Sequence, residues 1–364
     1  MEFIPQVEPY ISKGEIKAVV EYLKSGGWLT EFKKTEEFEE RICELLNIDY
    51  AVVVTSGTAA LYLSLLACGI SKGDKVIVPN FTMIATPNAV KWTGADVILV
   101  DIEKDTLCLD IKKIEKIDRS VKALIYVSLN GRSGNMDKVV KFCYENDIIL
   151  IEDSCQAFMS TWNNKYLGTF GIIGVYSLTP HKLITTGQGG IIVTNDESIY
   201  KKIKKLKDFC RVKPGVDLHE DIGYNFKFTD LQAVIGLEQL KSIKWRVKRK
   251  KEIYKFYYNS LKNVEEIKFI PTDLNQTVPW FIDILVEESI RDELINYLKT
   301  KNIGSRPFYP AINTQKPYKV YKGHFDISNT ISKQGLWLPS SLGLKYEELD
   351  YIVNNVRNFF SHRH

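Results

Sequence analysis

The feature that most constrains the fold is an alternation, from about residue 50 onward, of short β-branched runs with segments of helical spacing. Nearly continuous apolar strands of this kind are typical of a largely parallel sheet that is buried on both faces by helices. The runs are YAVVVTS, DKVIVPN, DVILVDI, KALIYVSL, DIILIEDS, GVYSL and GGIIVTN. The pattern therefore predicts an α/β fold in which ligands bind beyond the carboxyl ends of the strands.

The later part of the chain has a different character. After Gln239 the segment KSIKWRVKRKKEIYKFYYNSLKN predicts a long basic amphipathic helix, and PWFIDILVE and GLWLPSS are typical of a smaller α+β unit. We place a boundary near residue 245, which divides the chain into a large α/β domain over residues 1–245 and a small C-terminal α+β domain over residues 246–364. A chain of 364 residues, 45% of them hydrophobic, can bury cores of this size.

Charge and cysteine usage exclude several classes of protein. A net charge of +4, from 49 Lys and Arg against 45 Asp and Glu, is small for this length and argues against nucleic-acid binding. The lysine-rich run at residues 201–207 is expected to be the solvated face of a helix, with Ile203 and Leu206 facing inward. Six cysteines form neither a CxxC pair nor a Cys/His cluster, which favours reduced thiols and no metal site.

The sequence shows neither a membrane span nor a signal peptide. No run reaches about eighteen apolar residues, and the first segment, MEFIPQVEPY, lacks a basic region followed by an apolar core. We therefore expect a soluble, cytoplasmic protein that does not bind membranes.

The first candidate motif is VVVTSGTAALYLSLLA at residues 52–67. An apolar strand runs into Ser56, Gly57 and Thr58, after which the spacing becomes helical, so the N–H groups and the positive end of the helix dipole face the ligand zone. The same residues also fit an ordinary helix cap with a tight turn. No Walker lysine and no GxGxxG motif accompany them, which argues against nucleotide hydrolysis and dinucleotide binding.

The second motif is IILIEDSCQAF at residues 148–158, where Asp153 and Gln156 follow an apolar strand. A carboxylate at the mouth of a buried strand is costly unless it is paired, so Asp153 requires a cation or a metal, or else caps a helix. Cys155 has no histidine in a matching motif and is interpreted as a packing residue.

The third motif, YSLTPHKLITTGQGGIIVTN, places Lys182 five residues after Ser177 and before a glycine-rich turn. Such a lysine is a surface charge, a phosphate ligand or a covalent catalyst. The last role is open to a buried lysine, because burial lowers the pKa of an amine toward neutrality. Together the three motifs supply an anion anchor, a carboxylate for a pyridine nitrogen and an amine. Those groups are what a pyridoxal phosphate site requires.

These residues resemble the DegT/DnrJ/EryC1/StrS family, fold-type I pyridoxal phosphate aminotransferases that act on nucleotide-linked keto-sugars. The resemblance runs in the family's order through nearly the whole chain. Its blocks are GGWLT…FEERICELL, TSGTAALYLSLLACGISKGDKVIVPNFT, IEDSCQA, YSLTPHKLITTGQGG, IGYNFKFTDLQAVIGLEQL and GLWLPSS. The resemblance implies a fold-type I architecture, pyridoxal 5'-phosphate as cofactor and L-glutamate as amino donor.

The resemblance also implies roles for individual residues. Lys182 matches the lysine that binds the cofactor covalently and then moves protons, and Asp153 matches the partner of the pyridinium nitrogen. Gln156 matches the side chain that hydrogen-bonds the cofactor's ring oxygen. The expected phosphate ligands are Ser56, Gly57, Thr58 and Ser177.

Three further positions are interpreted from the resemblance. Asn225 matches a residue that reaches the phosphate of the neighbouring subunit, which implies a homodimer with shared active sites. Met83 stands where members commonly carry an aromatic residue stacked on the cofactor ring, a contact that sulfur can also make. His181 stands where many members have a small or amide residue, and it either contacts the substrate or caps the turn.

The segment IGSRPFYPAI resembles one in the family's GDP-perosamine synthases and makes Arg306 and Phe308 candidate substrate contacts. The GGWLT block adds Trp28 as a third candidate. The resemblance favours amination at C4 of a GDP-linked 4-keto-6-deoxy sugar, for a surface polysaccharide or glycan.

Three alternatives remain. The first is amination at C3 of a dTDP- or UDP-linked 3-keto sugar. The second is a 3-dehydratase of the same fold, in which a histidine replaces the lysine at position 182. The third is a non-catalytic regulatory member, which is expected to lack Lys182 or Asp153, whereas this chain has both.

Overall fold

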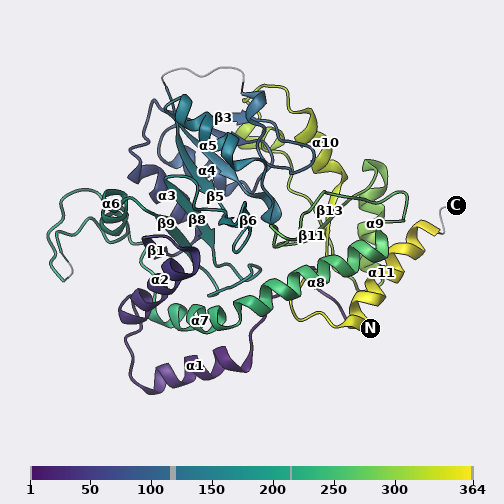
Figure 1. Ribbon diagram of the computed structural model, residues 1–364, viewed down its shortest axis with the longest axis horizontal. Coiled ribbons are helices and arrows are strands. Elements are labelled where there is room, and N and C mark those ends of the chain that lie inside the picture. The colour runs from purple at the N-terminus through teal and green to yellow at the C-terminus, as the bar shows by residue number, and fades with distance from the viewer. Residues whose placement is uncertain (1, 115–119, 214, 362–364) are drawn as a thin grey trace.

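The computed structural model describes residues 2–114, 120–213 and 215–361, and its centre is a seven-stranded sheet (Figure 1). The strands are β1 (Tyr50–Val54), β2 (Lys75–Pro79), β3 (Asp96–Val100), β4 (Val121–Val127), β5 (Ile149–Asp153), β8 (Ile173–Ser177) and β9 (Gly190–Thr194). Their order is β1-β9-β8-β5-β4-β2-β3. Within this sheet β9 runs antiparallel to both of its neighbours, and the other pairs are parallel. The prediction of a largely parallel sheet is confirmed.

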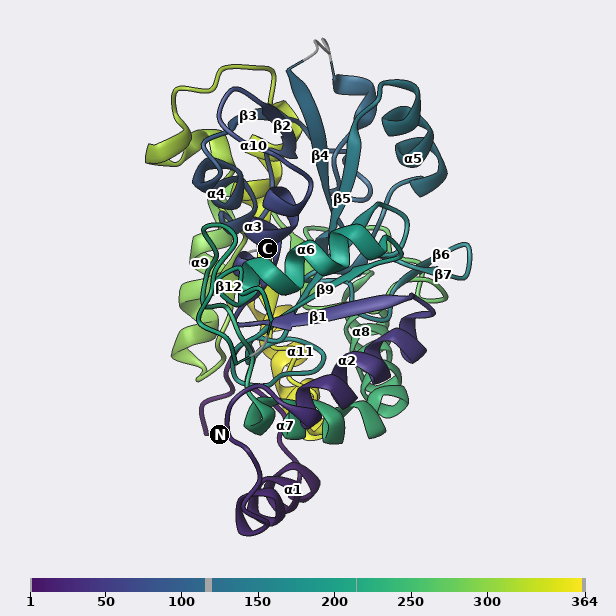
Figure 2. The ribbon, with the colours of Figure 1, turned by 90° about the vertical axis from the view of Figure 1, so that its left-hand side faces the viewer.

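Helices cover both faces of the sheet. They are α1 (Lys13–Lys24), α2 (Lys33–Leu46), α3 (Gly57–Ala67), α4 (Ala85–Trp92), α5 (Met136–Glu145), α6 (Glu197–Lys207) and α7 (Asp230–Lys241). Alternate side chains of a strand point to opposite faces. Val52 and Val54 of β1 therefore share a core with Leu61 of α3, whereas Val53 shares another core with Phe38 of α2. On that second face α2, α7 and α1 follow one another outward, and α1 lies farthest from the sheet (Figure 2).

The chain after α7 builds a second, antiparallel sheet of four short strands in the order β10-β11-β13-β12. Its elements are α8 (Ile243–Leu261), β10 (Lys268–Phe269), β11 (Ile282–Leu285), α9 (Glu288–Thr300), β12 (Arg306–Pro307), α10 (Asp326–Gln334), β13 (Gly335–Leu338) and α11 (Tyr346–Ser361). A small hairpin of β6 (Thr161–Trp162) and β7 (Lys165–Tyr166) precedes them. The predicted boundary near residue 245 falls inside α8, which extends from α7 to the second sheet (Figure 1).

The lysine-rich run at residues 201–207 lies in α6, and Ile203 and Leu206 face inward as predicted. The prediction that the lysines are solvated is wrong for Lys207, whose side chain is buried. Its Nζ lies 2.9 Å from Glu31 Oε1 and donates a hydrogen bond of 3.0 Å to the carbonyl of Val53. These oxygens replace water around the ammonium group, which makes its burial tolerable.

The basic helix predicted after Gln239 is α8, but two of its basic residues face the interior. Arg246 pairs with buried Glu15 of α1 at 2.9 Å, and it donates to the carbonyl of Leu183 at 3.3 Å. Lys250 is also buried and bonds only main-chain carbonyls in the described structure. Through Arg246, helix α8 therefore holds the main chain at Leu183, the residue directly after Lys182.

In the described part of the chain, no helix is both long and apolar enough to cross a bilayer.

Candidate active site

A cavity of about 240 Å³ lies where the carboxyl ends of β1, β2, β5 and β8 meet the second sheet. Parallel strands bring the residues that follow them to one edge of the sheet, so motifs far apart in the sequence converge there. The predicted site residues that line the cavity are Ser56, Gly57, Thr58, Met83, Asp153, Gln156, Ser177, His181, Lys182 and Arg306. Within the described ranges, no group of three or more potential metal ligands is present.

The start of α3 forms a cradle for an anion. Ser56 caps the helix by accepting a hydrogen bond of 3.1 Å from the N–H of Ala59, and the helix begins at Gly57. The first N–H groups of a helix have no partner within it and attract negative charge. A Cβ atom placed on Gly57 would lie 3.1 Å from Cys155 Sγ and 3.1 Å from Ser177 Cβ, so a glycine keeps this space open. The cradle fits a phosphate group.

Gly57→Ala is expected to weaken cofactor binding about tenfold or more, because the new methyl group would push Ser177 and the start of α3 apart and out of place for the phosphate, and overpacking of this kind costs about 1–3 kcal/mol. The dissociation constant is measured by titrating cofactor-free protein with pyridoxal 5'-phosphate. Gly343→Ala is the matched control, since its added Cβ would meet the nearest atom at an ordinary 3.6 Å. Equal affinities for the two variants would show that the cradle does not hold the cofactor.

Lys182 lies in the loop after β8, and its amine faces the cavity and the ring of Trp280. Burial lowers the pKa of this amine to about 8, although Cys155 and Asp153 act in the opposite direction. The positive charge of Arg306 lowers the pKa further. An amine with a pKa near neutrality can both accept and donate a proton.

The pKa of Lys182 predicts how the stability of the cofactor-free protein depends on pH. Because the folded state releases this proton near pH 8 and the unfolded chain near 10.5, stability rises with pH between those values. Below pH 8 the buried charge lowers the free energy of unfolding by its full amount, up to about 3 kcal/mol. Lys182→Met should therefore be more stable than the natural protein in urea unfolding at pH 7, and this advantage should shrink by pH 10. The exposed control Lys104→Met should give no advantage; an advantage of Lys182→Met that is independent of pH would contradict the assignment.

Asp153 ends β5 and is buried. Its Oδ2 accepts a hydrogen bond of 2.8 Å from the hydroxyl of Thr86, and its Oδ1 accepts one of 3.2 Å from the N–H of Cys155. Within residues 2–114, 120–213 and 215–361, no lysine or arginine forms an ion pair with it. A buried carboxylate without a cation fits a ligand that brings a protonated nitrogen.

Gln156 is buried beside Asp153, and a neighbouring main-chain group fixes the orientation of its amide. Its Oε1 accepts a hydrogen bond of 2.8 Å from the N–H of Asn130, which fixes the amide so that its Nε2 hydrogens are the donors for a further partner. This orientation suits the ring oxygen of the cofactor, which is an acceptor.

Met83 and His181 line the same cavity. Met83 is 45% exposed, and its sulfur accepts a hydrogen bond of 3.0 Å from the N–H of Ala85. Burial lowers the pKa of His181 to about 4, with smaller contributions from the charges of Lys182 and Arg306. The imidazole is therefore neutral at pH 7 and does not compete with Lys182 as an acid.

Arg306 lines the cavity from β12, and its guanidinium carbon lies 4.9 Å from the ring centroid of Trp337. No carboxylate pairs with it among the residues that the structure describes. The prediction that Phe308 contacts the substrate is not supported by its position, because its ring is 3% exposed and packs between Phe81 and Trp337. An apolar ring gains more from this burial than from a polar cavity. The next residue, Tyr309, lines the cavity instead.

Trp28 and Asn225 are exposed, and neither lines the cavity of its own chain. The carbonyl of Phe226 accepts a hydrogen bond of 3.2 Å from the N–H of Thr55, so the segment that carries Asn225 runs beside the end of β1. The segment at residues 28–32 lies next to it, because Glu31 accepts a hydrogen bond from the N–H of Phe228. These two segments therefore form one surface outside the cavity.

Sequence reasoning missed several residues of the site, among them Thr86, Gln188, Trp280 and Tyr309. Trp280 precedes β11 in the second sheet, and an aromatic residue at the start of a strand is ordinarily part of a core. Thr86 reaches Asp153 from α4, and no motif marks it.

The anion cradle, the cation-free carboxylate and the amine of low pKa stand around one cavity of an α/β fold. This arrangement places the chain among the pyridoxal phosphate-dependent aminotransferases. The chain belongs to the DegT/DnrJ/EryC1/StrS aminotransferase family, which it matches over residues 9–357.

Known proteins of this family and fold resemble the chain over nearly its whole length. A GDP-perosamine synthase of Escherichia coli O157:H7 is 35% identical over 99% of this chain and 100% of its own. The solved structure of PseC from Helicobacter pylori, an aminotransferase involved in the biosynthesis of pseudoaminic acid, has a TM-score of 0.91. It is 25% identical and covers 99% of this chain and 100% of its own. An E. coli GDP-4-keto-6-deoxy-D-mannose-3-dehydratase with bound hydrated pyridoxal phosphate has a TM-score of 0.89 at 25% identity, over 98% and 100% of the two chains.

Proposed function

We propose that this chain transfers an amino group from L-glutamate to the C4 keto carbon of a GDP-linked 4-keto-6-deoxy sugar, for a surface polysaccharide or glycan. The observation that carries the proposal is the amine of Lys182, which faces a cavity that Asp153 and Arg306 also line, and among the described residues neither of these two has an ion-pair partner. The E. coli relative named GDP-perosamine synthase supports the choice of nucleotide and carbon.

The proposed cofactor contacts follow from the residues around the cavity. Pyridoxal phosphate, when bound, supplies an electron sink for the exchange of an amino group. Ser56, Gly57, Thr58 and Ser177 would hold its phosphate, Asp153 its ring nitrogen and Gln156 its ring oxygen. Met83 would lie against the ring, where a sulfur contact replaces aromatic stacking.

Lys182 would bind the cofactor covalently and, once released, move the proton between the carbon atoms that react. Its pKa of about 8 leaves a useful fraction of each protonation state at neutral pH. Neutral His181 would contact the substrate by hydrogen bonding rather than by charge.

Arg306 would bind the anionic groups of the substrates. L-glutamate carries carboxylates and the sugar nucleotide carries a diphosphate, and a guanidinium group pairs well with either. Aromatic rings of Phe281, Tyr309 and Trp337 surround the guanidinium at 4.9–5.9 Å and hold it in place without neutralising it. Phe308 would support this site from the core.

The proposed assembly is a homodimer. In it Asn225 reaches the phosphate of the cofactor bound to the partner subunit, and Trp28 contacts the substrate in that same site. Helix α1 and the segment at residues 28–32 that follows it expose several large apolar side chains. They are Ile16, Val20, Leu23, Leu29 and Phe32. Exposed apolar side chains that gather in one region are typical of a protein interface. The free cysteines are compatible with the reducing cytoplasm, where we place the reaction.

A panel experiment tests the proposed reaction. The protein is incubated with pyridoxal phosphate, L-glutamate and GDP-, UDP- or dTDP-linked keto-sugars, and the products are identified by mass and by NMR. The proposal predicts a GDP sugar aminated at C4. Amination at C3, or loss of the 3-hydroxyl without amination, would replace it with a C3 aminotransferase or a dehydratase. Cofactor binding without any product would show that the substrate class is wrong.

A further inference from the structure

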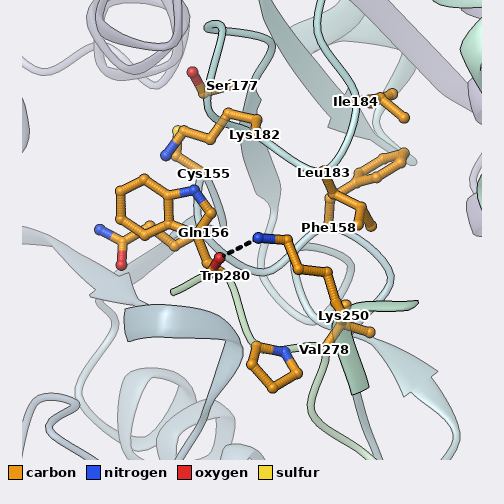
Figure 3. Close-up of a pocket in the computed structure, with 11 residues that line it drawn as sticks. Cys155, Gln156, Phe158, Ser177, Lys182, Leu183, Ile184, Lys250, Val278 and Trp280 are labelled. Carbon is orange, nitrogen blue, oxygen red and sulfur yellow. Dashed lines mark hydrogen bonds between the residues drawn. The ribbon is translucent and has the colours of Figure 1, made fainter. Parts of the chain in front are cut away.

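Trp280 lines the cavity and also a smaller neighbouring pocket, where it lies between Lys182 and Lys250 (Figure 3). The Nζ atom of Lys182 is 3.7 Å from the centroid of the indole ring, close enough for direct contact with the ring face. From the other side, Lys250 of α8 donates a hydrogen bond of 2.8 Å to the main-chain carbonyl of Trp280. Neither Trp280 nor Lys250 has a role in the function proposed above.

Trp280 is held both at its indole N–H and at its main-chain carbonyl. Its Nε1 donates a hydrogen bond of 2.8 Å to the carbonyl of His181, the residue directly before Lys182. Lys250 holds the Trp280 carbonyl and also donates to the carbonyl of Ser340 at 2.6 Å, so it ties the segment to the chain after β13. The ring stacks on Phe281 with centroids 3.7 Å apart and is 6% exposed. The ring therefore cannot turn away from the lysine without breaking these contacts.

The ring face of Trp280 stabilises the charged form of the Lys182 amine, whereas burial of the amine destabilises it. An aromatic face is electrostatically negative and stabilises a cation most strongly where water is excluded. The other charged or titratable groups that face the amine are Asp153, Cys155, Arg306 and His181. Within the described chain, none of these groups forms an ion pair with Lys182, so the ring is its closest cation-stabilising contact.

We propose that Trp280 is a positioning residue for Lys182, and that its ring face receives the ammonium group whenever this lysine is not joined to the cofactor. This proposal rests on the proposed function, because it concerns the lysine assigned to proton transfer there. The ring would keep the released amine beside the reacting carbon atoms and support its charged form. Lys250 and the carbonyl of His181 would hold the ring at the required position.

The test uses a series of tryptophans with increasing fluorination at position 280, because fluorine weakens the negative ring face while the ring shape is nearly retained. Cofactor-free protein is labelled with acetic anhydride at a range of pH values, and the acetylation of Lys182 is followed by peptide mass spectrometry. The pH at which acetylation of Lys182 is half-maximal (the midpoint) should lie near 8 in the natural protein. It should fall by about one pH unit over the series, because the ring face stabilises the ammonium form less as fluorination increases. A midpoint that is independent of fluorination would overturn the proposal.

Two controls separate a ring effect from a structural one. The same series at Trp245, which is 42% exposed on α8, should leave the midpoint unchanged. Trp280→Phe should keep much of the natural midpoint, whereas Trp280→Leu should show the full shift. Equal midpoints for these two variants would also contradict the proposal. Neither cofactor nor sugar enters the measurement, so its outcome is independent of the substrate panel.

Discussion

Lys182→Ala is expected to lower amino transfer by at least about 10⁴-fold, because it removes both the covalent link to the cofactor and the proton carrier. The alanine variant should still bind pyridoxal phosphate through the remaining contacts, with lower affinity. The rate of the first half-reaction with L-glutamate, followed by the absorbance of the bound cofactor, gives the loss directly.

Two controls make this result specific to Lys182. The exposed control Lys104→Ala should keep the natural rate. A small primary amine added to Lys182→Ala should restore part of the proton transfer, since it can occupy the space of the missing side chain. A variant that retains turnover without added amine would remove Lys182 from the mechanism.

Asp153→Asn is expected to lower turnover about 10- to 1000-fold. A neighbouring carboxylate shifts the pKa of a cation by about one to three units, and the neutral amide no longer keeps the ring nitrogen protonated. Thr86→Val, which removes the 2.8 Å hydrogen bond to the carboxylate, should give a smaller loss in the same direction. The exposed control Asp105→Asn should leave turnover unchanged, and a rate for Asp153→Asn equal to that control would contradict the assigned role.

The sheet could be predicted because its strands are apolar on both faces and the helices between them follow a different period. The direction of β9 could not be predicted, since an apolar run carries no information about which way it pairs. The burial of Lys207, Arg246 and Lys250 was missed for a related reason. A charge pattern marks the polar side of a helix, but the carboxylates and carbonyls that accept a buried cation come from distant segments.

The part of the site formed by strand ends could be predicted, since the carboxyl ends of parallel strands meet at one edge. Asp153 and Ser177 each end such a strand, Lys182 follows one, and all three line one cavity. Residues that enter from elsewhere left no local signal, as with Trp280, which precedes β11 of the second sheet. The choice between Phe308 and its neighbour Tyr309 depends on how β12 packs against β13, which residue type alone does not determine.

The central claim is that Lys182 is the residue joined to the cofactor, and reduction of the loaded protein with borohydride tests it most directly. The protein is digested after reduction, and the peptide with the added mass of the pyridoxyl phosphate group is sequenced by mass spectrometry. We expect the group on Lys182 and none on Lys250, the other buried lysine near Trp280. Modification of Lys250, or of neither residue, would contradict the claim.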